Sequence, residues 1–575
     1  MVPINVRSSD QGVADNIQRD SYQGQPPIYF CNIIIMFEEV PPMHLPRGRA
    51  CNACRRRKMK CDGNKPTCNQ CIRFGRVQEC EYLDVPQPPS TKVLEEHIAR
   101  LESRIHELED DPSAIHLHDP HAKYRQTPQT SSSTTQWWEA TEPPPPVAQQ
   151  LMKYFLPHAN KFGFFFDINR FASSMFEPTV STPRPPEVLR NTVYLWGINL
   201  SRDPQYTAHE STFVNKVLRS IHLALSSSQP QEVIYVLQAE VLLAYYFYFN
   251  SRMIEGKFHS SAAVSLAILC NLHKLWNPRG PATLAGGSGT LDIQIGMSLP
   301  PARDMLEEGD RIHAWWTTFI LENVWAVALG SPSTLSDADK NTRTAIETPW
   351  PLNLSEYNQA TRGNLGRTVS TYLENISSGQ ISSDTCFLSL HAKAALFYEK
   401  ADRMASFMES NIAAYRNEFS TLDVILERFK QTLPPPDRVD LTNMMVSHDT
   451  LLLHTLSQCA TIQLHIRFVS QNPTSRNRCL TSAQTCIRLL QAIPLRTLKV
   501  VNPIIAVLWV TVSEVITGAI RSLRSTRSAI ASSSALPGED SLLGALNQLA
   551  RAVENFSSGS PYMHAQIAKF RQVQG

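Results

Sequence analysis

The sequence predicts a mainly α-helical protein with a small cysteine-rich module, a short coiled coil and a large all-α domain. Three observations predict this organisation. Six of the twelve cysteines lie between Cys51 and Cys80, and an apolar heptad pattern follows a proline-rich stretch. From about Val147 onward, long helical periodicities occur with few strand signals. A chain of 575 residues is also too long for a single compact core.

Changes in composition along the chain divide it into six expected segments. The prolines of Val85–Ser90 favour an extended connector, and the Ser-, Thr-, Gln- and Pro-rich stretch before the large domain does not support a packed core. We expect a poorly structured N-terminal segment at 1–46, the cysteine-rich module at 47–84, a linker at 85–92, the coiled-coil helix at 93–110, a disordered linker at 111–146 and the all-α domain at 147–570.

Charge and hydropathy indicate a globular protein with a local basic segment and no expected transmembrane helix. Charged residues make up 18% of the chain and apolar residues 42%, which is typical of a globular protein. The net charge of +2 does not identify a partner, but Arg47–Lys60 holds seven Lys or Arg residues and no Asp or Glu. Because no run of about 18 apolar residues occurs, we expect no transmembrane helix and no membrane partner. No secretory signal directs the chain to an oxidising compartment.

The clustered cysteines follow the spacing C-x2-C-x6-C-x6-C-x2-C-x8-C. Two CxxC pairs place thiolates close enough to share a metal, and zinc prefers four sulfur ligands in a tetrahedron. Six thiolates satisfy two zinc ions if two sulfurs bridge. A disulfide framework and a single zinc with two spare thiols are the alternatives. The scattered cysteines are interpreted as inert core residues.

A basic run, Arg55-Arg56-Arg57-Lys58-Met59-Lys60, lies between the second and third cysteines of the cluster. Metal ligands bracket this run, so they hold its short helix in place although the module has little core of its own. With two zinc ions and six thiolates the module keeps a charge of about +6, which favours phosphate binding that weakens steeply with salt.

These residues resemble the fungal Zn2Cys6 binuclear zinc cluster family, and the matching strings are Cys51–Cys61 and Lys65–Cys71. The resemblance implies two Zn2+ per chain, with Cys51 and Cys68 as bridging sulfurs. It implies that Cys54 and Cys61 complete one zinc site and that Cys71 and Cys80 complete the other. It also implies a nuclear, sequence-specific transcription factor of the RNA polymerase II type, whose first helix enters the major groove of double-stranded DNA at a CGG-type triplet.

Lysine and arginine are the donors that match the O6 and N7 atoms of guanine. Lys58 is the first candidate for the base contact, with Arg57 beside it. Arg55, Arg56 and Lys60 are better candidates for phosphate contacts. The alternative is that these residues form only a solvated cationic face or a nuclear import signal.

The heptad stretch places Ile98 and Ile105 at a positions and Leu94, Leu101 and Leu108 at d positions. β-Branched residues at a with leucine at d favour a parallel two-stranded coil, so we expect a homodimer that presents two clusters to two half-sites. The coil spans about 18 residues, or roughly 27 Å, and is marginal alone. The alternative is an amphipathic helix that packs on its own chain.

Helical periodicities in the C-terminal region predict an all-α domain. The expected helices are Glu232–Asn250, Ser260–Leu272, Arg311–Leu329, Leu388–Asn411, Asp449–Val469, Ser482–Ala492, Pro503–Leu523 and Ser541–Phe556. Its aromatic stripes are interpreted as core, with Gly256 preceding the second of these helices.

From about Pro146 to Ala568 the chain also resembles the fungal-specific transcription factor regulatory domain, most clearly at Arg311–Pro332 with Trp315-Trp316. Two departures occur: Glu322-Asn323 stands in place of the usual Asp-Arg pair, and Gly330-Ser331-Pro332 in place of Gly-Arg-Pro. The resemblance implies a regulatory domain that responds to metabolites or to partners such as the transcription machinery or co-regulators.

An enzyme is not expected, because six thiolates around two zinc ions leave no open coordination position. The sequence contains no G-x-S-x-G or H-E-x-x-H motif, and Gly286–Gly289 lacks the Gly-Lys-Ser/Thr of a phosphate loop. The second functional alternative is a zinc-stabilised protein-interaction module or co-regulator without DNA sequence specificity of its own.

Overall fold

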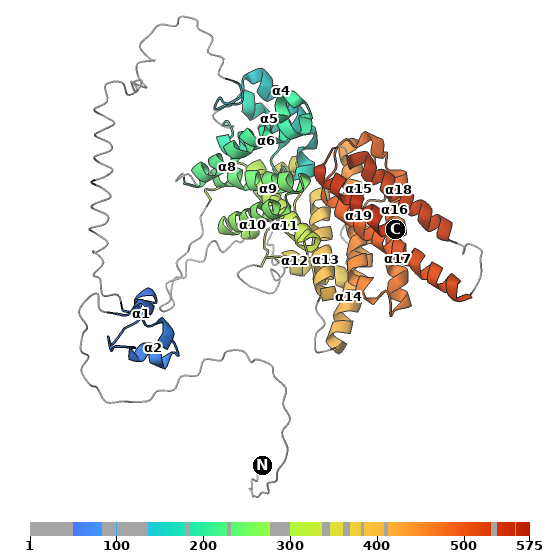
Figure 1. Ribbon diagram of the computed structural model, residues 1–575. Coiled ribbons are helices and arrows are strands. Elements are labelled where there is room, and N and C mark those ends of the chain that lie inside the picture. Colours follow the sequence, from blue (N-terminus) through green and yellow to red (C-terminus); the bar gives the residue numbers. More distant parts are fainter. Residues whose placement is uncertain are drawn as a thin grey trace, which may run out of the picture. The chain divides into compact units, whose positions relative to one another are not determined.

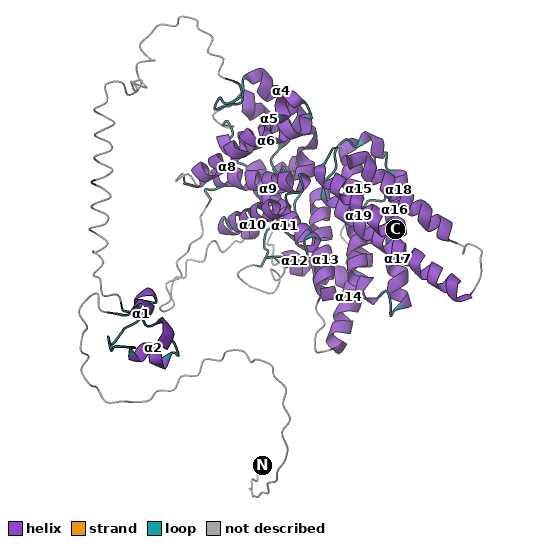
Figure 2. Ribbon diagram, viewed as in Figure 1, coloured by secondary structure: helices purple, strands orange, loops and turns teal. Residues whose placement is uncertain are grey.

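The computed structural model describes residues 50–82, 99, 136–179, 183–226, 232–275, 299–335, 345–359, 368–380, 384–406, 412–530, 538–557 and 559–574. They belong to two compact units, one within Met1–Ser132 and one within Ser133–Gly575. Helices build both units, and no strand occurs among these residues (Figure 2). The predicted mainly α class, with a small cysteine module and a large helical domain, is confirmed.

Several predicted features lie outside the described residues. These are the N-terminal segment 1–46, the linker 85–92 and the heptad residues Leu94, Ile98, Leu101, Ile105 and Leu108. The coiled coil therefore stays a prediction.

The first unit is a small module whose core consists mainly of sulfur. It contains helix α1 (Asn52–Arg56), helix α2 (Asn69–Arg73) and the 3-10 turn η1 (Val77–Glu79). Five cysteines and Ala53 form its buried cluster, and Met59, Cys61 and Tyr82 pack against it. So few aliphatic side chains cannot support a fold of this size without a metal.

The second unit is a single helical domain. Its longer helices are α4 (Pro145–Phe155), α5 (Ile168–Phe176), α6 (Glu187–Ser201), α8 (Glu210–Ser226), α9 (Val233–Phe249), α10 (Met253–Leu269), α11 (Met305–Ala328), α12 (Thr368–Ser377), α13 (Phe387–Ser406), α14 (Ile412–Thr432), α15 (Met444–His465), α16 (Pro473–Ala492), α17 (Ile504–Ile530), α18 (Glu539–Ser557) and α19 (Pro561–Gln574). Short elements connect them: η3 (Leu156–Phe162), α7 (Pro204–Thr207), η5 (Leu272–Lys274), η6 (Leu354–Gln359), η7 (Pro436–Arg438), η8 (Ile466–Phe468) and η9 (Leu495–Thr497).

Helices in this domain pack mainly on the next helix or the next but one along the chain (Figure 1). Helix α4 packs on α6, α9 on α10, α11 on α13, α13 on α15, and α17 on both α18 and α19. One continuous apolar core reaches from Ala148 to Met563. The helices after α14 therefore belong to the same folding unit as those before it.

The eight helices expected from periodicity all occur, but their starts differ. Helix α10 begins at Met253, so Gly256 lies inside this helix and does not precede it as expected. A Cβ on Gly256 would lie 2.4 Å from the Tyr248 ring, so this glycine lets α10 approach α9. Helix α11 begins at Met305, where the Asp304 carboxylate accepts a hydrogen bond from the Glu307 backbone N–H at 2.7 Å.

The last residues of the predicted linker 111–146 pack on the helical domain. The Trp138 ring stacks on His209 with centroids 3.6 Å apart, and the Lys216 ammonium donates to the Ala140 carbonyl at 2.6 Å. The Tyr194 hydroxyl donates to the Glu142 carboxylate at 3.1 Å. Aromatic burial at the end of the segment therefore extends the folded unit N-terminally, although composition alone indicated a linker.

Within the described part of the chain, one helix, α17, contains a stretch long and apolar enough to cross a membrane by length and composition alone, Ile504–Ser525. This finding differs from the expectation that no such run occurs. The stretch is interrupted at Thr511, Ser513 and Glu514, but its mean hydropathy stays high despite these residues. In its most apolar window 61% of the residues are buried, as in the core helix of a globular protein.

Candidate metal centre and nucleic-acid interface

The cysteine module repeats one local motif twice. Cys51 caps the N-terminus of α1 and Cys68 caps that of α2, and each Sγ accepts a hydrogen bond from a backbone N–H three residues on, at 3.4 Å. Each CxxC pair therefore places its two thiols on the first turn of a helix. Two residues after the end of each helix the backbone is left-handed, at Lys58 (φ +54°) and Gly75 (φ +66°).

The sulfur atoms are spaced as metal ligands are. The Sγ atom of Cys51 lies 3.7 Å from that of Cys68, and the Sγ atom of Cys54 also lies 3.7 Å from that of Cys68. Four sulfurs at about 2.3 Å from one zinc form a tetrahedron with edges of about 3.8 Å. Both distances are close to this edge length, and none of the six clustered cysteines is in a disulfide.

Two groups of four ligand atoms, each within 4.8 Å of one another, can be drawn from the six cysteines. One group is Cys51, Cys54, Cys61 and Cys68, and the other is Cys51, Cys68, Cys71 and Cys80. Cys51 and Cys68 belong to both. The cluster therefore forms two tetra-cysteine metal sites with two shared sulfurs, which suits a binuclear zinc centre.

Burial disfavours the ionised form of some thiols in this cluster. Burial, together with the neighbouring thiols, raises the pKa of Cys54. Desolvation and the neighbouring thiols raise the pKa of Cys71 to about 12. Thiols with such values stay protonated near neutral pH, whereas bound Zn2+ favours the thiolate form strongly.

Polar contacts around the cysteines hold the loops that carry them. The Asp62 carboxylate accepts hydrogen bonds from the Asn69 backbone N–H at 3.1 Å and from the Asn64 amide at 2.9 Å. The Tyr82 hydroxyl donates to the Asn64 carbonyl at 2.9 Å and lies 3.8 Å from the Cys61 Sγ atom. Asp62 and Tyr82 were not predicted as functional residues, because their partners become visible only in the folded module.

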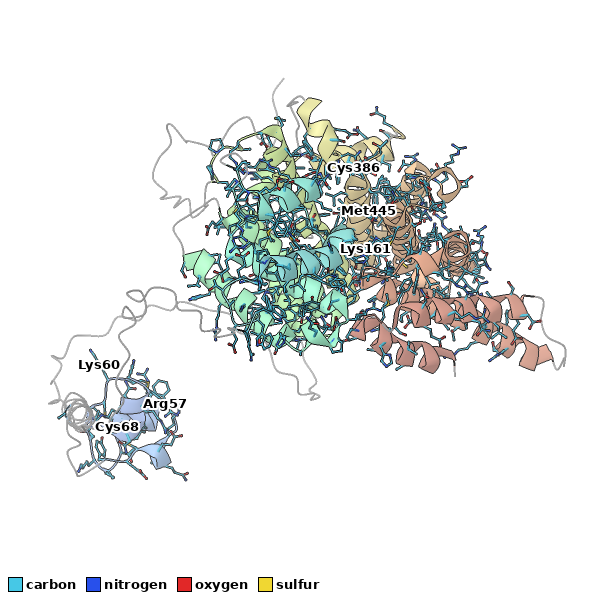
Figure 3. All side chains as sticks on the ribbon, turned by 90° about the horizontal axis from the view of Figure 1, so that it is seen from above. Arg57, Lys60, Cys68, Lys161, Cys386 and Met445 are labelled. Atoms are coloured by element: carbon cyan, nitrogen blue, oxygen red, sulfur yellow. The ribbon has the colours of Figure 1, made fainter. Side chains whose placement is uncertain are left out.

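The five predicted DNA-contacting residues all lie at the surface of this module, where Figure 3 labels Arg57 and Lys60 near Cys68. Arg57 donates to the Glu79 carboxylate at 2.8 Å, and Arg56 lies 3.8 Å from the same oxygen. The Arg57 guanidinium holds the pKa of Glu79 below its usual value. No ion pair involves the two lysines, Lys58 and Lys60, among the described residues.

In the helical domain, the family-divergent Glu322 forms a buried ion pair of its own. Its carboxylate is fully buried and accepts hydrogen bonds from the Lys257 ammonium at 2.9 Å, from the Ser260 hydroxyl at 3.1 Å and from Thr334. The neighbouring Asn323 side chain accepts from the Ser333 hydroxyl at 2.7 Å. Helices α10 and α11 are therefore joined through this lysine.

Two family comparisons match the chain. Residues 49–89 match the family described as the fungal Zn(2)-Cys(6) binuclear cluster domain. Residues 151–431 match the family described as the fungal specific transcription factor domain. The helical unit of the structure continues beyond the second match, since α15–α19 share its core.

Similar curated proteins align mainly over a short segment. The chain is 43% identical over 56 residues to the putative transcription factor ecdB of Aspergillus rugulosus, which is 10% of each chain. It is 36% identical over 86 residues to the citrinin biosynthesis transcriptional activator ctnR of Monascus purpureus, covering 15% of this chain and 14% of that protein. It is 38% identical over 61 residues to the lactose regulatory protein LAC9 of Kluyveromyces lactis, covering 11% and 7%.

These alignments leave most of each protein unmatched. The chain spans about a tenth of the length of the curated relatives that it matches first. No solved structure matches the chain significantly.

Proposed function

The chain carries a fungal Zn2Cys6 binuclear cluster domain and a fungal-specific transcription factor domain, and we propose that it is a zinc-dependent, sequence-specific DNA-binding regulator acting in the nucleus. One observation carries the proposal. Two tetra-cysteine sites that share Cys51 and Cys68 fix the short helix α1, whose basic side chains face solvent. A rigid cationic helix of this kind suits the major groove of DNA.

In this proposal the six cysteines hold two zinc ions. Cys51 and Cys68 bridge the two ions. Cys54 and Cys61 complete one tetrahedron, and Cys71 and Cys80 complete the other. The metal pair supplies the cation that ionises the thiols and closes the module, whereas the protein supplies the direction in which α1 points.

Lys58 is proposed to read guanine in a CGG-type half-site. Its backbone has φ +54°, a conformation that costs a non-glycine residue about 1–2 kcal/mol. Gly75 fills the equivalent position after α2. A lysine at a position whose backbone conformation favours glycine indicates a functional role for its side chain. An exposed ammonium group just after a helix can reach a base edge.

The other basic residues are proposed to act mainly on the DNA backbone. Arg55, Arg56 and Lys60 are exposed and suit phosphate contacts. Arg57 lies next to Lys58 and is the second candidate for a base contact, and its ion pair with Glu79 fixes its orientation.

We also propose that the chain binds DNA as a homodimer through the predicted coil at 93–110. Leu101→Asp at a d position should convert the dimer to a monomer in light scattering. The matched change Ser103→Asp, at an outward-facing f position, should leave the mass unchanged. A dimer that survives Leu101→Asp would place the contact elsewhere.

The DNA-binding proposal is tested with the full-length, zinc-loaded chain. Fluorescence anisotropy at fixed salt should give nanomolar binding to a duplex with CGG half-sites and at least tenfold weaker binding to a scrambled duplex of equal composition. Equal affinity for both duplexes would favour the alternative, a zinc-stabilised interaction module without sequence specificity of its own.

A further inference from the structure

A cleft of about 360 Å3 opens in the helical domain, at the N-terminal ends of α5, α9 and α11. Its lining includes Phe166, Arg170, Tyr235, Asp310 and Arg311. A volume of this size lies in the range of small-molecule sites, about 300–1,000 Å3. The proposed DNA-binding function uses none of these residues.

One wall of the cleft is aromatic. The rings of Phe166 and Tyr235 have centroids 5.2 Å apart at an interplanar angle of 32°. Burial raises the pKa of Tyr235, so this wall is uncharged. The Tyr235 hydroxyl has no hydrogen-bond partner within the described residues, and it is available to a ligand.

The arginines of the cleft already form ion pairs with carboxylates. Arg170 donates to Asp304 at 3.0 and 3.2 Å. Arg311 and Arg303 both donate to Glu307 at 2.8 Å. Three guanidinium groups thus face the Asp304 and Glu307 carboxylates, and the Asp167 carboxylate, which also lines the cleft, supplies a third negative charge. The lining therefore does not select a strongly anionic or strongly cationic ligand.

Among the charged residues of the cleft, Asp310 differs from the paired groups because it is buried and has no ion-pair partner among the described residues. Its side chain lines the cleft although the residue is only 5% exposed, and it accepts one hydrogen bond, from the Asp167 backbone N–H at 3.3 Å. Its other carboxyl oxygen has no partner within the described part of the chain. Burial raises the pKa of Asp310 to about 8, so near neutral pH the group is mostly a carboxylic acid that can donate its proton.

We propose that this cleft binds a neutral, planar aromatic molecule that carries a carbonyl oxygen. The rings pack against Phe166 and Tyr235, and the carbonyl oxygen accepts a hydrogen bond from the Asp310 carboxyl group. A carboxylate ligand would meet Asp167 and Glu307, and an ammonium ligand would meet the guanidinium groups. Binding is measured without DNA, so the outcome is independent of the DNA-binding proposal.

The probe is 6-propionyl-2-(dimethylamino)naphthalene, a neutral bicyclic ketone whose emission shifts to the blue on leaving water. Titration of the full-length, zinc-loaded chain should show one saturable site. Ile234→Trp, which fills the cleft, should abolish binding, and Tyr235→Ala should weaken it at least tenfold. Circular dichroism and the melting temperature establish that each variant is folded.

Phe258→Ala provides the matched control for nonspecific binding. Phe258 is 68% exposed on α10 and does not line the cleft, so its loss should leave the titration unchanged. Loss of binding in Phe258→Ala but not in Ile234→Trp would overturn the proposal. Tighter competition by naphthalene-2-carboxylate or by 2-naphthylmethylammonium than by the neutral ketone 2-acetylnaphthalene would overturn the proposed ligand class.

The dependence of ligand affinity on pH tests the role of the Asp310 carboxyl group, because a residue with only a structural role would not produce this dependence. With a pKa of about 8, the donating form falls about tenfold between pH 7 and pH 9, and wild-type affinity should fall equally. Asp310→Asn cannot ionise but still donates an N–H, so it should bind equally at both values. A wild-type affinity independent of pH, or an Asp310→Asn variant that still loses binding, would refute this hydrogen bond.

The charged groups that face Asp310 come mainly from two helices. Asp167 and Arg170 approach it from α5, and Asp304, Glu307 and Arg311 from α11. Hydrogen bonds from arginines and backbone N–H groups hold the pKa values of Asp304 and Glu307 below their usual range, and burial raises the pKa of the Tyr235 hydroxyl, which faces Asp310 from α9. A change of affinity in this window is therefore assigned to Asp310.

Discussion

Replacing Lys58 with glycine separates the contact that its side chain makes with DNA from the backbone geometry that presents it. The residue has φ +54°, and glycine adopts this conformation without the cost of about 1–2 kcal/mol that a Cβ atom imposes. Gly75 shows that the module accepts glycine at the equivalent position. Lys58→Gly should therefore bind two zinc ions per chain and unfold no more easily than the wild type.

The same change should weaken DNA binding. A good base contact contributes about 1–3 kcal/mol of discrimination, which corresponds to about a 5- to 150-fold loss of affinity for a CGG duplex. The assay is an anisotropy titration at fixed salt against CGG and against duplexes with one guanine replaced. Preference for guanine should fall at a single position.

Lys60→Ala is the matched control, because Lys60 is also an exposed lysine of the basic run but is assigned to phosphate. It should weaken binding to all duplexes alike and reduce the slope of log affinity against log salt by about 1. If Lys58→Gly lowers affinity uniformly and keeps the wild-type preference for guanine, Lys58 contacts phosphate and the base-reading assignment is wrong.

Three further predictions concern the metal centre and the helical domain. Cys51→Ala should bind less zinc per chain than Cys61→Ala by elemental analysis, because Cys51 belongs to both tetra-cysteine groups and Cys61 to one; equal zinc contents would contradict shared sulfurs. Lys257→Met leaves the fully buried Glu322 carboxylate without its cation and should lower the free energy of unfolding by about 3–5 kcal/mol in denaturant. Adding Glu322→Gln to this variant should restore much of the lost stability. A loss under about 1 kcal/mol for Lys257→Met alone would contradict the buried ion pair. The pKa of Asp310 lies above that of an unfolded aspartate, about 3.9, so its stabilising contribution is complete below that value and is lost as pH rises toward about 8. The melting temperature of Asp310→Asn should therefore rise relative to wild type between pH 5 and pH 8, and parallel curves would show that the pKa is not raised.

The cysteine module could be predicted from the sequence because its metal ligands lie close together along the chain. A CxxC pair at the start of a helix places both thiols on one turn, and six ligands within Cys51–Cys80 leave few ways to enclose metal. Helical periodicity likewise indicated the core helices of the large domain, because one face of each must be buried. The heptad repeat at 93–110 predicts a dimer on the same local grounds.

Other features were decided only by tertiary packing. The Arg57–Glu79 ion pair joins residues 22 apart, and Gly256 proved to be a contact point with Tyr248 inside a helix.

The cleft lining is drawn from residues far apart in the sequence, such as Phe166 and Asp310. Spacing along a chain determines geometry over about one helical turn, whereas the distance between remote segments depends on how whole helices pack. The sequence by itself therefore determined the metal-binding module and the helical class. Only the folded domain placed the buried carboxyl group of Asp310 beside an aromatic wall.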